Sequence, residues 1–161
     1  MEKFFVENVC LDAPGLAIKG SSSALFKYSN TFRVKAGGLV SDAITTADAP
    51  ALSLSKGPQA AATSNLADGY CRWYTLLGSI SATDGTVTMS LVHGSDYSGT
   101  DNPVPLTSYI NQGNKGDAAK VAIGYVHIYN HSSADFVPGT TDLDASNVTT
   151  TYYDNFGFIG M

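Results

Sequence analysis

Charged side chains are scarce in this sequence. Asp, Glu, Lys and Arg make up 14% of its 161 residues, and glutamate occurs only at Glu2 and Glu7. Surface helices depend on such residues, so a mainly helical fold is excluded. Ser, Thr, Asn and Gly must form much of the surface instead. Because these side chains lose little entropy on contact, such a surface suits strands and large static interfaces.

Basic stretches and long apolar runs are missing as well. Residues 1–80 carry seven basic and six acidic side chains, and residues 81–161 carry two and eight, so the net charges are +1 and −6. Without a basic stripe that displaces counterions, a nucleic-acid partner is not expected. No stretch reaches transmembrane length, so no membrane partner is expected.

Cysteine is also rare, with only Cys10 and Cys71. Residues 1–8 lack the apolar core of a signal peptide. We therefore expect synthesis in a reducing cytoplasm, where both thiols stay free.

Short runs of Val, Thr, Tyr and Phe, separated by Gly, Asn, Asp, Ser and Pro, predict strands and turns. Residues 70–80 are apolar on both faces and predict a central strand. The pair Asp84-Gly85 predicts a hairpin into a return strand over residues 86–93. Residues 148–153 predict a final strand.

Two further runs predict strands with assigned faces. Residues 25–35 predict one strand, followed by a Gly37-Gly38 hairpin, and residues 121–129 predict another. The residues expected to share a face are Phe26, Tyr28, Asn30, Phe32 and Val34 in the first, and Val121, Ile123, Tyr125, His127 and Tyr129 in the second. Residues 45–69 and 94–120 predict long loops.

These patterns predict an all-β fold, an antiparallel β-sandwich or jelly-roll-like domain over residues 25–161. An extended N-terminal arm is expected over residues 1–24. The apolar side chains that end the sequence are expected to pack either on the domain's own core or on a neighbouring subunit. The predicted interface anchors are Phe4, Phe5, Val6, Phe156, Phe158 and Ile159.

The sequence contains no recognisable catalytic, cofactor or metal motif. A nucleophile elbow, a phosphate-binding glycine loop and a Cys-x-x-Cys pair are all absent. His93, His127 and His131 are too few and too scattered for a metal site. We therefore predict no enzyme, no cofactor and no bound metal.

Asp142 and Asp144 leave an alternative open, since paired carboxylates can bind calcium or perform acid–base chemistry. Aspartate also stabilises turns, which is the interpretation we favour here.

Three segments resemble structural proteins of tailed-bacteriophage particles. The first comprises residues 120–129 (KVAIGYVHIY) and 135–148 (DFVPGTTDLDASNV). The second is residues 30–38 (NTFRVKAGG) with Ala47-Asp48, and the third is residues 69–74 (GYCRWY) with Asp84-Gly85. Together the resemblance covers residues 16–150.

The resemblance implies a virion protein of the head-decoration (cement) or fibre type. Such proteins are often trimeric and bind the major capsid protein or other virion proteins; no catalytic residues carry over. Two alternatives remain open. One is a head or tail fibre component that binds host glycans through exposed Tyr and Trp73. The other is a glycan-cleaving virion enzyme that uses Asp142 and Asp144.

Overall fold

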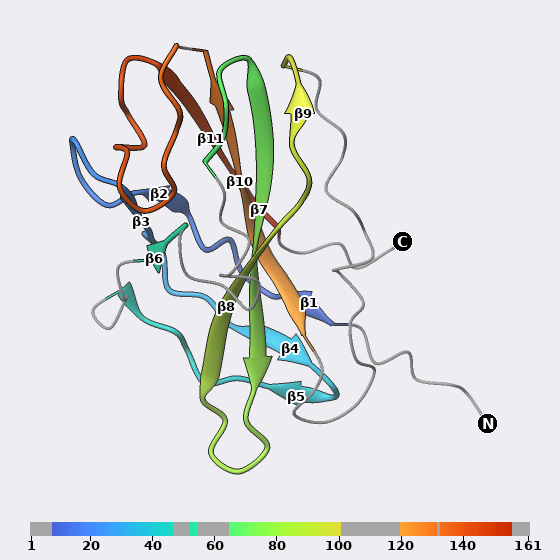
Figure 1. Ribbon diagram of the computed structural model, residues 1–161. Coiled ribbons are helices and arrows are strands. Elements are labelled where there is room, and N and C mark those ends of the chain that lie inside the picture. Colours follow the sequence, from blue (N-terminus) through green and yellow to red (C-terminus); the bar gives the residue numbers. More distant parts are fainter. Residues whose placement is uncertain (1–7, 47–51, 55–64, 101–119, 132, 156–161) are drawn as a thin grey trace.

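The computed structural model describes residues 8–46, 52–54, 65–100, 120–131 and 133–155, and these form an all-β, sandwich-like fold (Figure 1). This part of the chain contains no α-helix. The strands are β1 (Val9–Cys10), β2 (Leu16–Ile18), β3 (Leu25–Tyr28), β4 (Val34–Ala36), β5 (Leu39–Val40), β6 (Leu52–Ser53), β7 (Tyr70–Ile80), β8 (Val87–His93), β9 (Tyr97–Ser98), β10 (Val121–Asn130) and β11 (Val148–Asp154).

One five-stranded antiparallel sheet is the main layer. Its strands follow the order β11-β10-β7-β8, and β9 pairs with the start of β7. The long strands β7 and β10 occupy the middle and are buried along most of their length, as their apolar sequences predict. The two edges are therefore β11 and β8.

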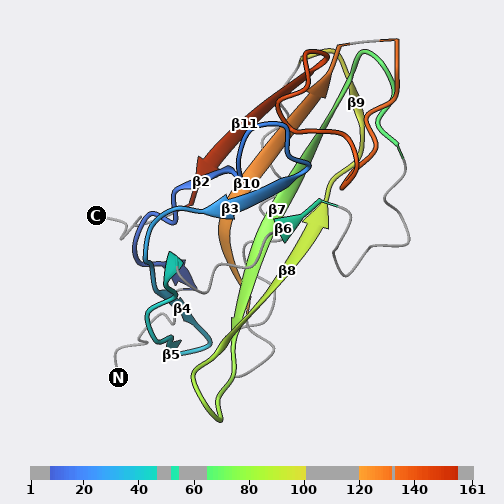
Figure 2. The same cartoon turned by 90° about the vertical axis from the view of Figure 1, so that its left-hand side faces the viewer.

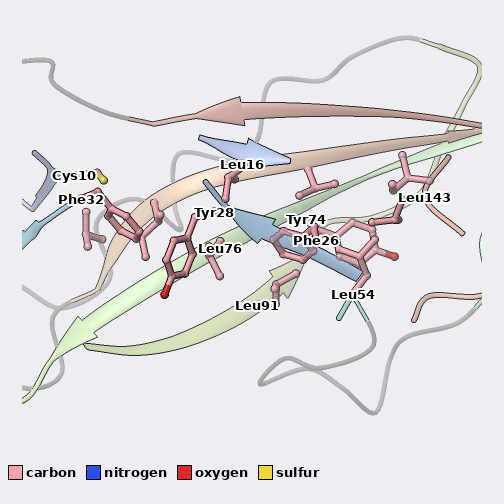
Figure 3. Packing of buried hydrophobic residues seen from close by; sticks show 14 of the residues in the cluster. Cys10, Leu16, Phe26, Tyr28, Phe32, Leu54, Tyr74, Leu76, Leu91 and Leu143 are labelled. Carbon is pink, nitrogen blue, oxygen red and sulfur yellow. The ribbon is translucent and has the colours of Figure 1, made fainter. Parts of the chain in front are cut away.

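Two three-stranded sheets, β2-β3-β6 and β1-β4-β5, lie along one face of the five-stranded sheet (Figures 1 and 2). The core fills the space between these layers (Figure 3). Every sheet contributes to it, for example Cys10 from β1, Phe26 from β3, and Tyr74 and Leu76 from β7. Each such apolar side chain contributes about 1.5–3 kcal/mol by leaving water.

The face predicted for β10 is correct at Val121 and Ile123 but wrong after Gly124. Val121 and Ile123 point into the core, but Tyr125, His127 and Tyr129 lie on the opposite face, while Val126 and Ile128 fill the core. The cause is a shift in the register between β10 and β7 at Ala122 and Gly124. A bulge of this kind inserts one residue and exchanges the two faces of all that follow.

The single strand predicted over residues 25–35 is divided. The structure forms β3 and β4 there, and they belong to different sheets. Phe26, Phe32 and Val34 are buried as expected. Asn30 lies between β3 and β4, is exposed, and donates a side-chain hydrogen bond to the Ala13 carbonyl at 3.1 Å.

Both predicted hairpins are confirmed. Gly37 and Gly38 join β4 to β5 with φ of 60° and 87°, which side chains with a Cβ disfavour. Gly85, with φ of 71°, lies in the turn between β7 and β8, and the two strands pair directly.

The predicted arm over residues 1–24 contains β1 and β2. Cys10 and Leu16 are core residues there, so residues 9–18 are integrated into the sheets. Residues 1–7 lie outside the described residues, and an extended arm at that end stays a prediction.

Candidate interaction site along the β8 edge

A groove of about 640 Å³ opens beside β8, between the five-stranded sheet and the small sheets. One wall is the β7–β8 hairpin and β8 itself. The other wall comes from Tyr28 in β3, from residues 42–45 and from β6. Most of its depth is lined by apolar side chains, namely Tyr28, Ile44, Leu52, Leu76, Val87, Met89 and Leu91.

The groove also reaches the main chain of β8. Met89, Ser90 and Leu91 all line it, although neighbouring side chains on a strand point to opposite faces. A lining that includes three consecutive residues therefore includes backbone. The groove is open along the edge of the sheet as well as between the layers.

Hydrogen bonds at the two ends of β8 fix which of its backbone groups point outward. The Ser81 N–H donates to the Thr86 carbonyl at 2.9 Å, and the Gly94 N–H donates to the Trp73 carbonyl at 2.9 Å. Because hydrogen-bonded pairs alternate along an antiparallel ladder, Thr88, Ser90 and Val92 bond to β7.

The N–H and C=O groups of Val87, Met89 and Leu91 therefore point away from β7. Within the described residues these groups have no strand partner, because β8 pairs only with β7. They recur every second residue, which is the spacing at which a further strand would bond to them.

The sequence of β8 does nothing to block this edge. Its seven residues include no Lys, Arg, Asp, Glu or Pro, and its register with β7 is continuous. Edge strands of proteins that stay monomeric usually carry such charges, prolines or bulges. An edge without them is suited to pairing.

Among the described residues that line the groove, Asp42 is the one that carries a charge. Its side chain lies beside the hairpin turn, since a Cβ added to Gly85 would be 3.8 Å from Asp42 Oδ2. Asp42 is exposed. The hairpin end of the groove therefore carries a negative charge.

The loop after β8 is held by an ion pair between the buried Arg72 and the more exposed Asp96. The Arg72 side chain, 1% exposed, donates to both carboxylate oxygens of Asp96, from Nε at 2.5 Å and from Nη2 at 2.9 Å. Burial alone would lower the pKa of Arg72, but its bonds to Asp96 and Tyr74 hold that pKa above its ordinary value. The guanidinium therefore stays charged inside the domain.

Aromatic rings gather on the second face of the five-stranded sheet, away from the core. The Trp73 ring centroid lies 4.6 Å from that of His127 and 5.3 Å from that of Tyr153. Trp73 is only 9% exposed, so the prediction of an exposed tryptophan is wrong. Tyr70, Tyr97 and Tyr153 are the exposed aromatic residues of the described chain.

Of the predicted acidic pair, Asp144 is bonded through its side chain to a distant segment and Asp142 through its backbone to a neighbouring residue. Asp144 accepts a hydrogen bond from the Ser22 N–H at 2.9 Å, and the Asp142 carbonyl accepts one from the Ala145 N–H. No group of three or more His, Cys, Asp or Glu side chains able to hold a metal forms within the described ranges. Calcium binding at Asp142 and Asp144 stays untested.

Both cysteines are buried, and no disulfide joins them, as expected. Burial raises the pKa of the Cys10 thiol to about 12. His93 bonds through Nδ1 to the Gly94 carbonyl at 2.9 Å, and the buried Nε2 atoms of His93 and His127 have no hydrogen-bond partner among the described residues. Burial lowers the pKa of His127.

The predicted interface anchors fall outside the described residues. They are Phe4, Phe5, Val6, Phe156, Phe158 and Ile159. The groove along β8 was missed by sequence reasoning, although an uncharged alternating strand over residues 86–93 was its signal. Recognising it required knowing that this strand lies at an edge.

No family model, no curated protein and no solved structure matches this chain. In the part of the chain that the structure describes, no helix has the length and apolar character needed to span a membrane.

Proposed function

We propose that this chain is a non-enzymatic structural protein of a bacteriophage particle, a head decoration (cement) protein that stabilises the shell through trimer and capsid contacts. The observation that carries the proposal is the unprotected β8 edge beside an apolar groove. A strand edge and a groove of this kind bind other polypeptides rather than perform chemistry.

Composition and resemblance support the same function. A surface poor in Lys and Glu loses little side-chain entropy in permanent contacts. The segments that resemble tailed-phage structural proteins include β10 and the start of β7. Binding that favours the assembled shell raises its stability by mass action, and repeated copies add avidity.

The test is the composition and stability of purified particles of the phage that encodes this sequence. We expect the protein in the particle in a fixed ratio to the major capsid protein. Particles that lack it should lose their genome at lower temperature or lower salt than complete particles. Absence of the protein from purified particles would reject the proposal.

A fibre component that binds host glycans is the second candidate. Tyr153 is 42% exposed, its ring lies 5.3 Å from that of Trp73 at an angle of 40°, and flat aromatic faces are suited to sugar rings. Binding to a glycan array that Tyr153→Ala removes, while Tyr70→Ala retains it, would favour this candidate. Uniform lack of binding would leave the cement function as the better account.

A further inference from the structure

We propose that the groove along β8 binds residues 3–6 of a second copy of this chain, which add to the five-stranded sheet as a further strand. The inference rests on the proposed function in one respect, that the protein assembles with its own copies. It specifies the contact that joins them.

The backbone of β8 requires a strand rather than a small molecule as the occupant. Val87, Met89 and Leu91 each present an outward N–H and C=O, spaced by two residues, along the open side of the groove. An added strand bonds to all of them at once, whereas an apolar ligand bonds to none. Leaving such groups unpaired in an apolar setting is unfavourable.

The side chains that line the groove fit Lys3-Phe4-Phe5-Val6. In an extended strand Lys3 and Phe5 share one face. Phe5 suits the apolar interior around Leu76 and Met89, and the Lys3 ammonium complements Asp42 at the rim. Phe4 and Val6 then extend the second face of the sheet beside Val92 of β8. The pattern therefore matches the groove in both polarity and charge.

The position of β1 favours a neighbouring copy as the donor. Asn8, where the described chain begins, donates a side-chain hydrogen bond to the Lys120 carbonyl, just before β10, at 3.2 Å. In the sheet, β7 separates β10 from β8, and both views of the fold place β1 and β8 on opposite sides of β7 (Figures 1 and 2). Head-to-tail exchange between copies closes into a ring, such as a trimer.

The first part of the test is the mass of the full-length protein in solution as a function of concentration. The wild type should form a closed oligomer that dissociates on dilution. Met89→Pro removes an outward N–H, a change that edge strands tolerate, and should weaken association about tenfold or more. Met89→Leu, the matched control, should leave association unchanged.

The second part exchanges the two charges. Lys3→Asp and Asp42→Lys should each weaken association about tenfold, and the two together should restore it. Lys3 lies before the described sheets, so a failure to associate cannot be attributed to unfolding of the groove. An unchanged far-ultraviolet spectrum and denaturant midpoint confirm that each variant folds.

Three results would overturn the inference. One is a monomer at every concentration, which would place any added strand within the same molecule. Another is an oligomer that survives Met89→Pro and Lys3→Asp. The third is loss of association in Met89→Pro but not in Lys3→Asp, which would mean that a segment other than residues 3–6 pairs with β8. An oligomer built through other contacts would still permit incorporation into particles, so the proposed function is tested separately.

Discussion

The two edges of the five-stranded sheet differ in how they end. At the β11 edge, Asp154 accepts hydrogen bonds from the N–H groups of Gly15 and Leu16, at 3.0 and 2.9 Å, and so ties β11 to β2. At the β8 edge, a groove separates the sheet from residues 42–45 and β6. A side chain at the end of β11 therefore ties that edge to a small sheet, while the groove keeps β8 apart from residues 42–45 and β6.

The largest expected effect concerns the ion pair between Arg72 in β7 and Asp96 in the loop after β8. Asp96→Ala should lower the free energy of unfolding by about 3–5 kcal/mol, because it leaves a buried guanidinium without its carboxylate. Urea denaturation measures this. Combining Arg72→Met with Asp96→Ala should recover much of the loss, whereas a loss below about 1 kcal/mol in Asp96→Ala would show that the pair is not a constraint.

Asp154 and Asp42 compare the two edges directly. Asp154→Ala should lower the free energy of unfolding by about 1.5–3 kcal/mol, since two backbone donors lose a charged acceptor. Asp42→Ala, at the open edge, should change it by less than about 0.5 kcal/mol. Equal losses in the two variants, measured by the same denaturation, would remove the distinction between a sealed and an open edge.

Two glycines test the packing at the same edges. A Cβ on Gly124 would lie 2.5 Å from the Leu16 Cδ1 atom and 2.7 Å from the Tyr153 carbonyl oxygen. Gly124→Ala should therefore lower the free energy of unfolding by about 1–3 kcal/mol. Gly94→Ala, directly after β8, meets nothing closer than 3.9 Å and should stay within about 0.5 kcal/mol of the wild type. Thermal unfolding that ranks them the other way would contradict the packing described.

The smallest expected effect lies between the edges, at His127 in β10. Burial lowers its pKa below the ordinary value of 6.5, so the unfolded chain binds a proton more readily than the folded one. Stability should therefore fall as the pH drops below about 6.5, and His127→Phe should flatten that part of the profile. An identical slope in both proteins would mean that another group causes it.

Much of the sheet architecture follows from sequence, because it depends on local pattern. The apolar run of residues 70–80, the alternation of residues 86–93 and the Asp84-Gly85 turn predict β7, β8 and their pairing, which the structure confirms. The faces of β10 could not be predicted from the sequence, because one residue inserted between Ala122 and Gly124 reverses them without changing the hydrophobic pattern. The division of residues 25–35 into β3 and β4 could not be predicted either, because long-range packing decides which sheet each strand joins.

The groove was harder to predict than the strands that line it. Its walls come from β8, from β3 and from residues 42–45, which are far apart in sequence. The low charge of β8 is visible in the sequence, but it equally suits a buried central strand. Trp73 shows the reverse problem, because an aromatic side chain expected at the surface is covered on the second face.

Amide hydrogen exchange along β8, resolved by residue, tests the central claim most directly. In dilute protein the account predicts alternation, with Val87 and Met89 exchanging fast and Thr88 and Ser90 slowly, because only the second pair bonds to β7. On assembly, the Val87 and Met89 amides should become protected. Slow exchange at Met89 in the dilute monomer, equal to that at Ser90, would mean that the edge is already paired and would contradict the account.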